Sequence, residues 1–268
     1  MKKTPFEKKA LDNISLDFYE NQYTAIIGAT GSGKSTLIQH LNGLLKPDQG
    51  EVLVDGMSTK DKKSQLDLRK KVGVVFQYAQ YQLFEETVYK DIEFGLIKRN
   101  IAAEERKERI LKTASLVGLT DENLRASPYD LSGGQKKRAA IAGILVLEPE
   151  ILVLDEPAAG LDPEGTKELF KIIEALHNKK ECTVILVAHS MELVARYAKR
   201  VIVLDQGQVV MDGTRDEIYS QEEKLVSLGL DIPEITKIIK RVKKTYPQIN
   251  DNIYTVSQAK EELLKYLK

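Results

Sequence analysis

Short apolar runs alternate with helix-like patterns along most of the chain. Ile151–Leu154 and Val184–Val187 are unbroken apolar segments, and Tyr23–Ile27 is a short, mostly apolar one, which is typical of strands buried on both faces of a sheet. Val201–Leu204 and Val209–Met211 flank a four-residue turn and predict an antiparallel hairpin. Because helical patterns separate most of these runs, the sequence predicts an α/β fold with a mainly parallel sheet and an antiparallel segment.

Helical patterns also indicate two additions to this fold. Residues 87–145 are charged and helix-prone, and we interpret them as an inserted helical subdomain within a domain covering 1–212. Apolar stripes near Ile235–Val242 and Leu263–Leu267 predict a helical C-terminal extension over 213–268. A further strand is expected at Leu16–Tyr19, where polar and apolar residues alternate.

Composition narrows the possible partners. Forty basic residues balance forty acidic ones among the 268 residues, so no basic excess points to nucleic acid, and none is expected as a partner. A single cysteine, Cys182, fits a reducing compartment. No apolar run is long enough to cross a bilayer, and the N-terminus lacks the apolar core of a signal peptide. We therefore expect a cytosolic protein that associates with a membrane only peripherally, through a partner.

The loop after Tyr23–Ile27 matches the phosphate-binding pattern GxxxxGK[ST] in every required position. Glycines let several main-chain N–H groups point at one anion, at the start of a helix whose dipole favours negative charge. Lys34 is expected to neutralise the β- and γ-phosphates, and the Ser35 hydroxyl to bind Mg²⁺. The predicted nucleotide-binding residues are Gly28, Ala29, Thr30, Gly31, Ser32, Gly33, Lys34, Ser35 and Thr36.

An acidic pair ends the apolar run Ile151–Leu154. Asp155 is expected to hold Mg²⁺, mostly through water, because this ion prefers oxygen ligands and loses its hydration shell reluctantly. Glu156 would orient the attacking water and accept its proton. Taken alone, such a pair could equally be a solvated strand end.

The pentapeptide Leu131, Ser132, Gly133, Gly134 and Gln135 offers a second anion-binding element. Ser132 is a good helix N-cap, and the two glycines permit close approach of a ligand to the main chain. In isolation it could be an ordinary helix start. Placed between the phosphate loop and the acidic strand, however, it resembles the signature motif of the ATP-binding-cassette (ABC) family.

This resemblance implies a P-loop ATPase that works in head-to-tail pairs. Ser132 and Gly134 of one subunit would close on the ATP bound by another, and Asp162 would lie in a loop that touches that subunit. Gln77 resembles the glutamine that contacts Mg²⁺ and the attacking water, and His189 resembles the histidine that contacts the γ-phosphate. ATP is the implied substrate and Mg²⁺ the implied cofactor.

Within the family, the segment after Gln77 and the C-terminal extension resemble the ATPases of energy-coupling-factor (ECF) importers of vitamins and metal ions such as cobalt. That resemblance implies a transmembrane coupling subunit, with Tyr78, Tyr81 and Phe84 as candidate contacts, and a separate membrane protein that selects the cargo. These aromatic residues could also pack inside the helical subdomain. Homodimer and heterodimer both stay open, and so does the residue that stacks on adenine, for which Phe6 is the available ring.

Three other functions fit this sequence less well. A DNA-maintenance ATPase would place a long coiled coil between the phosphate loop and the signature, and the interval here is too short. A ribosome-acting member normally carries two cassettes in one chain, whereas this chain has one. A regulator that binds nucleotide without hydrolysing it would not need Glu156 and His189, and both are present.

Overall fold

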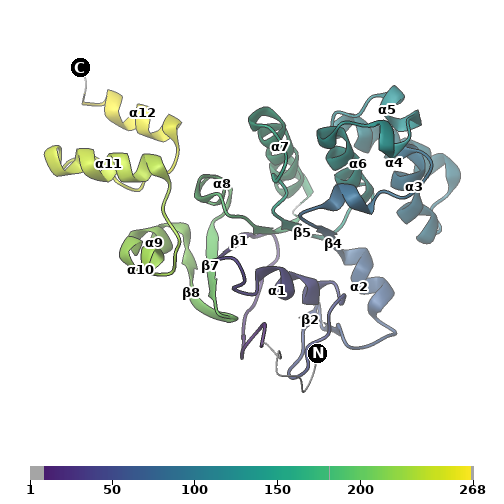
Figure 1. The fold of residues 1–268 in the computed structure, drawn as a ribbon, viewed down its shortest axis with the longest axis horizontal. Helices are drawn as coiled ribbons and strands as arrows, with labels where there is room; N and C mark the ends of the chain where they lie inside the picture. The colour runs from purple at the N-terminus through teal and green to yellow at the C-terminus, as the bar shows by residue number, and fades with distance from the viewer. Residues whose placement is uncertain (1–8, 181, 267–268) are drawn as a thin grey trace. The chain divides into compact units, whose positions relative to one another are not determined.

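The computed structural model describes residues 9–180 and 182–266. Phe6, the candidate adenine contact, lies outside the described residues. The strands of the larger sheet follow the order β4-β5-β6-β1-β7-β8 (Figure 1). Their bounds are Tyr23–Ile27 (β1), Val72–Val75 (β4), Ile151–Asp155 (β5), Thr183–Val187 (β6), Arg200–Asp205 (β7) and Gln208–Thr214 (β8). The chain divides into two compact units, one within residues 1–18, 22–37 and 186–268 and the other within 19–21 and 38–185.

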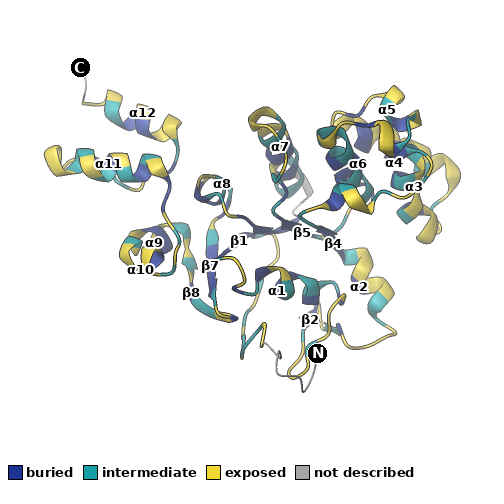
Figure 2. Ribbon diagram, in the orientation of Figure 1, coloured by how far each residue is buried: buried dark blue, intermediate teal, exposed yellow. Residues whose placement is uncertain are grey.

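In the first unit, β1 pairs in parallel with β7, in a register that joins Thr24 to Arg200 and Ile27 to Val203. β7 continues into β8 through a tight turn and pairs with it antiparallel. This hairpin was predicted, and the alternation of parallel and antiparallel pairing confirms the predicted sheet type. The side chains of β1 and β7 are largely buried (Figure 2), as the unbroken apolar runs require.

The strand expected at Leu16–Tyr19 is wrong, because this segment is irregular. The Arg200 guanidinium donates to the main-chain oxygen of Asp17 over 2.7 Å. A side chain thus satisfies a carbonyl that a strand would pair with a neighbouring strand. Polar and apolar alternation alone did not reveal this competition.

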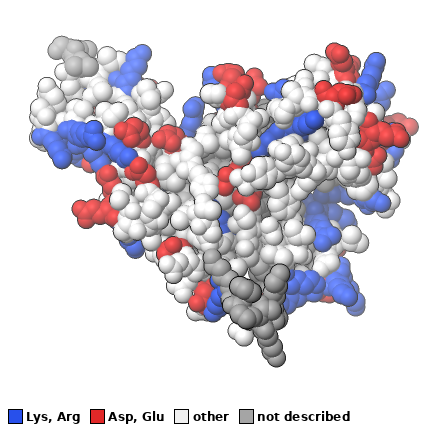
Figure 3. Space-filling model, in the orientation of Figure 1, with Lys and Arg blue, Asp and Glu red and all other residues white. Residues whose placement is uncertain are grey.

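Helices follow β8 to the end of the described chain. They are α9 (Arg215–Ser220), α10 (Glu222–Ser227), α11 (Glu234–Thr245) and α12 (Val256–Leu264), while α8 (Met191–Tyr197) precedes β7. Ile239 of α11 and Ala259 of α12 share a small buried cluster with Ile249 and Ile253. Lys and Arg side chains gather over α11 (Figure 3), where Lys240 pairs with Glu222 and Lys243 with Asp251. The boundary of the extension at residue 213 stays a prediction.

The second unit holds β4 and β5, which pair in parallel from Val72 with Ile151 to Val75 with Leu154. A short hairpin of β2 (Leu53–Val54) and β3 (Met57–Ser58) lies in the same unit. Its helices are α2 (Gln65–Lys71), η1 (Ala79–Gln82), α3 (Val88–Lys98), α4 (Ala103–Leu116), α5 (Asp121–Arg125), η2 (Pro128–Asp130), α6 (Gly133–Leu145) and α7 (Pro163–Lys180).

Helices α3 to α6 gather into a cluster (Figure 1), built on buried side chains such as Ile92, Leu96, Ile110 and Leu124. This is the helical region that the sequence predicts between the phosphate loop and the acidic strand. Nowhere in residues 9–180 and 182–266 is a helix both apolar and long enough to span a bilayer.

Candidate functional site

The phosphate loop belongs to the first unit and connects β1 to α1 (Lys34–Leu41). Gly28, Gly31 and Gly33 all have positive φ, at 155°, 82° and 107°, a region that favours glycine. A Cβ on Gly28 would lie 2.2 Å from the carbonyl oxygen of Leu204, so the loop packs too closely against β7 for any side chain there. Local backbone geometry therefore dictates the glycines of the motif.

Lys34 is the charged group of this loop. It is only 6% exposed, and its Nζ donates to the carbonyls of Gly28 at 2.8 Å and Ala29 at 2.9 Å. Its ammonium is thereby held inside the curl of the loop, where a phosphate oxygen would need a cation. The Ser32 hydroxyl is buried in the same loop and finds no hydrogen-bond partner among the described residues. A buried orphan hydroxyl beside a buried ammonium fits a phosphate ligand.

The acidic pair lies in the second unit, where β5 ends. Asp155 is 5% exposed, and Glu156 follows it with φ of +47°. A left-handed conformation is uncommon for a residue other than glycine, and it costs free energy that functional sites often retain.

Glu156 is oriented by a glutamine that follows β4. Gln77 Nε2 donates to Glu156 Oε2 over 2.9 Å. Because β4 and β5 are paired in parallel, their carboxyl ends bring these two side chains together, although 79 residues separate them. The structure thus brings together two residues that the sequence singled out separately, Glu156 as the expected base and Gln77 as an expected contact of Mg²⁺ and water, and both roles stay predictions.

A third residue at this place escaped the sequence analysis. Lys137 lies on α6, is 2% exposed, and donates from Nζ to the carbonyls of Gln77 at 3.0 Å and Ala159 at 2.9 Å. Burial lowers the pKa of its ammonium, and the nearby charge of Glu156 opposes part of that shift. The sequence could have predicted the burial of Lys137. It is four residues before Ile141 and eight before Leu145, so helical spacing places it on the same apolar face of α6.

The signature motif begins α6. Ser132 Oγ accepts from the Gln135 N–H at 3.3 Å, and Gln135 Oε1 accepts from the Ser132 N–H at 2.9 Å, so the two form a capping box. The predicted N-cap is confirmed. A Cβ on Gly133 or Gly134 would find no atom within 4 Å, which leaves the start of the helix open to a ligand.

Asp162 and His189 occupy contrasting places. Asp162 Oδ1 accepts from the Gly165 N–H at 2.7 Å and thereby caps α7 in the second unit. His189 follows β6, is exposed, and precedes Ser190, which caps α8. Both positions suit residues that meet a ligand or another subunit, and both roles stay predictions.

The aromatic residues after Gln77 are exposed, Tyr78 by 58%, Tyr81 by 82% and Phe84 by 61%. They do not pack inside the helical cluster, the alternative that the sequence left open. Phe84 instead meets the edge of Phe94 at 5.0 Å between ring centroids, and both N–H groups of residues 84 and 85 donate to Asp91. Burial raises the pKa of Asp91, although these donors oppose the shift. Phe94 is a fourth exposed ring that the sequence analysis did not select.

The predicted Mg²⁺ ligands are chemically suitable one by one. The Ser35 hydroxyl in the first unit, and the Gln77 amide and the Asp155 carboxylate in the second, all carry the hard oxygen atoms that this ion prefers, and a common site for them stays a prediction. No cluster of three or more His, Cys, Asp or Glu side chains within the described ranges could hold a metal ion. Such sparse ligation is usual for Mg²⁺, which takes most of its ligands from water and substrate phosphates.

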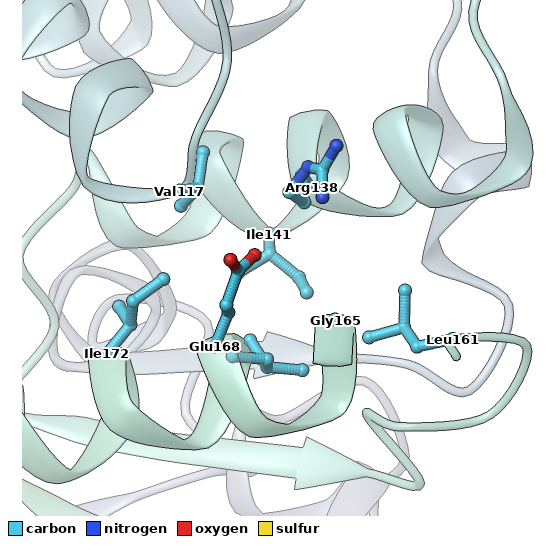
Figure 4. Close-up of a pocket in the computed structure, with 8 residues that line it drawn as sticks. Val117, Arg138, Ile141, Leu161, Gly165, Glu168 and Ile172 are labelled. Carbon is cyan, nitrogen blue, oxygen red and sulfur yellow. The ribbon is translucent and has the colours of Figure 1, made fainter. Parts of the chain in front are cut away.

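A pocket between α6 and α7 lies apart from these residues (Figure 4). Arg138 and Ile141 line it from α6, and Glu168 and Ile172 from α7, together with Val117, Leu161, Gly165 and Leu169. None of the predicted site residues lines it. We therefore do not assign the pocket to the nucleotide chemistry.

Comparison with known proteins identifies the family to which the chain belongs. Residues 11–159 match the family model described as ABC transporter. An energy-coupling factor transporter ATP-binding protein, EcfA2, from Acetivibrio thermocellus is 54% identical over 268 residues, covering 100% of this chain and 95% of that protein. The protein of the same name from Listeria monocytogenes is 45% identical and covers 99% of this chain and 94% of its own length.

Two solved structures share the fold. CbiO1 from Clostridium perfringens, described as part of the ABC transporter complex CbiONQ, matches with a TM-score of 0.72 at 36% identity, covering 86% of this chain and 92% of its own. A dimeric ATP-binding cassette, MJ0796, bound to ADP and phosphate after hydrolysis, matches with a TM-score of 0.73 at 33% identity, covering 79% and 94%. The chain therefore belongs to the ABC transporter family, as an ATPase of the energy-coupling-factor type.

Proposed function

We propose that this chain hydrolyses Mg-ATP as one of two ATPase subunits that together power an importer in the membrane. The observation that carries the proposal is the 2.9 Å hydrogen bond from Gln77 to Glu156, beside the buried Asp155. A carboxylate at a strained position, held by an amide and adjacent to a second carboxylate, is suited to act as a general base on water. The full-length similarity to ECF transporter ATPases supports the same activity.

Binding of the triphosphate falls to the loop of the first unit. We assign contacts with the phosphate oxygens to the main-chain N–H groups of Gly28–Thr36 and to the Lys34 ammonium. Ser35, Gln77 and Asp155 are the residues that would hold Mg²⁺. When bound, the ion would offset the negative charge that builds up on the β- and γ-phosphates.

The hydrolytic step needs a positioned water and a place for its proton. Glu156 takes the proton in our assignment, while Gln77 fixes the direction of that carboxylate and contacts the water. His189 is assigned to the γ-phosphate as a hydrogen-bond donor. These three side chains would thus orient the nucleophile and stabilise the transferred phosphoryl group.

The second phosphate-binding element is assigned to the other subunit's nucleotide. Ser132 and Gly134 lie at an exposed helix start with open space around the glycines, which suits a ligand delivered by another molecule. Asp162 would meet the same subunit. A head-to-tail dimer built in this way buries two ATP molecules, and the dimeric cassette MJ0796 offers a structural parallel.

Coupling to the membrane is assigned to the exposed rings of Tyr78, Tyr81 and Phe84, which directly follow Gln77. A transmembrane subunit bound to these rings would contact the segment that directly follows Gln77, so its movement and the position of Gln77 would be coupled. The chain would then work at the cytoplasmic face of the membrane, held there by that partner. The ECF resemblance assigns cargo choice, for a vitamin or a transition metal, to a separate membrane protein.

Purification of the chain from membranes tests these assignments. We expect a second ATPase subunit and a transmembrane subunit to travel with it, and the complex to hydrolyse ATP only when Mg²⁺ is supplied. Isolation of the chain without any membrane protein, under detergent conditions that preserve other transporters, would contradict the proposed coupling. A complex without Mg-ATPase activity would contradict the catalytic assignment.

A further inference from the structure

Lys137 is a buried cation with no place in the roles assigned above. It lies two residues after Gln135, the last residue of the signature motif, and belongs to the buried face of α6. Burying a lysine ammonium this deeply costs free energy unless hydrogen-bond acceptors surround it. Its two acceptors are main-chain carbonyls, one of Gln77 itself and one of Ala159, three residues after Glu156.

The first acceptor is the carbonyl of Gln77, the residue whose side chain orients Glu156. The second is the carbonyl of Ala159, and the Ala159 N–H in turn donates to the carbonyl of Glu156 over 3.0 Å. The ammonium thus holds the main chain beneath Gln77 and the far end of the turn that begins at Glu156. It holds main-chain groups on both sides of the Gln77–Glu156 hydrogen bond.

The helix that carries Lys137 is capped at its start by Ser132, the residue assigned to the partner's nucleotide. A displacement of α6 on contact with that nucleotide would therefore be transmitted through one side chain to both carbonyls. Small shifts matter here, because a misplacement of about 1 Å in a catalytic group can reduce a rate by roughly 100-fold.

We propose that Lys137 is a positioning residue that links the signature helix to the Gln77–Glu156 pair of the same subunit. The proposal rests on the function proposed above. It assigns Lys137 no contact with ATP, with Mg²⁺ or with the attacking water. Its contribution is to keep the base and its amide partner in register, and to make that register depend on the position of α6.

Replacing Lys137 with Met in the purified transporter complex tests this role, since Met keeps most of the length and removes every donor. We expect kcat for ATP hydrolysis to fall about tenfold or more, while KM and the affinity of the isolated subunit for ATP stay within about twofold. Lys112→Met, on the exposed face of α4, is the matched control and should leave both values unchanged.

The decisive comparison is with Gln77→Ala. If Lys137 keeps Gln77 and Glu156 in register, adding Lys137→Met to Gln77→Ala should reduce kcat by a clearly smaller factor than Lys137→Met does alone, whereas independent effects would multiply. Multiplied effects would overturn the proposal, as would a normal kcat in Lys137→Met, or equal losses of kcat and ATP affinity.

Lys137→Gln keeps an amide donor on a shorter side chain, and it replaces Lys137→Met in this test if the Met variant does not fold. The same lack of additivity with Gln77→Ala is expected, and multiplied effects would again contradict the proposal. An inactive wild-type complex would contradict the proposed function itself. A fully active wild type with a fully active Lys137→Met and Lys137→Gln would contradict only the role of Lys137.

Discussion

The two phosphate-binding elements of this chain are built in opposite ways. In the loop of residues 28–36, three glycines have positive φ, a Cβ on Gly28 would strike a main-chain oxygen, and the Lys34 ammonium is satisfied by carbonyls of the loop itself. In the signature of residues 131–135, the helix start is exposed, and a side chain on either glycine would meet nothing. One element is closed and preformed, and the other is open.

This difference indicates where each ligand comes from. A preformed loop needs no other molecule to bind phosphate, because its donors and its cation are already arranged. An open helix start, capped by its own serine and glutamine, presents donors without enclosing anything. We infer that the first element binds ATP in a single subunit, whereas the second acts only when another subunit brings its ATP to it.

The largest loss of ATP turnover is expected at Glu156, because hydrolysis of the ATP held by both phosphate-binding elements depends on this base. Glu156→Gln removes the proton acceptor but keeps the shape and the neighbour Gln77, so turnover should fall about 1,000-fold, within the range usual for a general base. ATP should remain bound and hold two subunits together, as measured by nucleotide retention and by sedimentation. Hydrolysis at the wild-type rate would show that another residue is the base.

The next effect separates the two elements. Gly134→Asp places a negative charge at the open helix start, where repulsion of the partner's γ-phosphate should lower turnover by about 100-fold. The isolated subunit should still bind ATP normally, because its own loop is untouched. Gly134→Asn is the uncharged control of nearly the same size, and the loss that Gly134→Asp shows beyond it measures the repulsion. Loss of ATP binding in the isolated Gly134→Asp subunit would refute the division of labour.

Two glycine substitutions compare the closed phosphate loop with the open signature by their effects on the free energy of unfolding. Gly28→Ala should lower the free energy of unfolding by about 2 kcal/mol or more, because φ is +155° and the new Cβ would strike the Leu204 carbonyl. Gly133→Ala should change it by less than about 0.5 kcal/mol, since the methyl group points into open space. Denaturant unfolding measures both. Equal losses would mean that the signature is as tightly packed as the loop.

The smallest effect concerns the membrane partner. Tyr81 is 82% exposed, so Tyr81→Ala should leave stability and ATP binding unchanged but weaken association with the transmembrane subunit about tenfold, the effect of losing one interface aromatic. Tyr19→Ala, another exposed tyrosine, is the control for co-purification. If the Tyr81→Ala variant associates with the transmembrane subunit as well as the wild type does, Tyr81 is not part of the proposed contact.

Much of the fold could be predicted from the sequence, because unbroken apolar runs fix strands such as β5 and β6, and glycine geometry fixes the loop at Gly28. The irregular segment at Leu16–Tyr19 could not, since a distant arginine satisfies its backbone. The pairing of Gln77 with Glu156 depends on strand order, which no local pattern records. Lys137 was not among the predicted site residues, because lysines are mostly exposed, although its helical register places it on the buried face of α6.

The central claim is that each subunit supplies only half of a catalytic site. Dilution of the purified ATPase complex, with specific activity and sedimentation followed on the same samples, tests this most directly. The account predicts that specific activity falls in proportion to the fraction of paired subunits and returns when the sample is concentrated. A constant specific activity at concentrations where only single subunits sediment would contradict it.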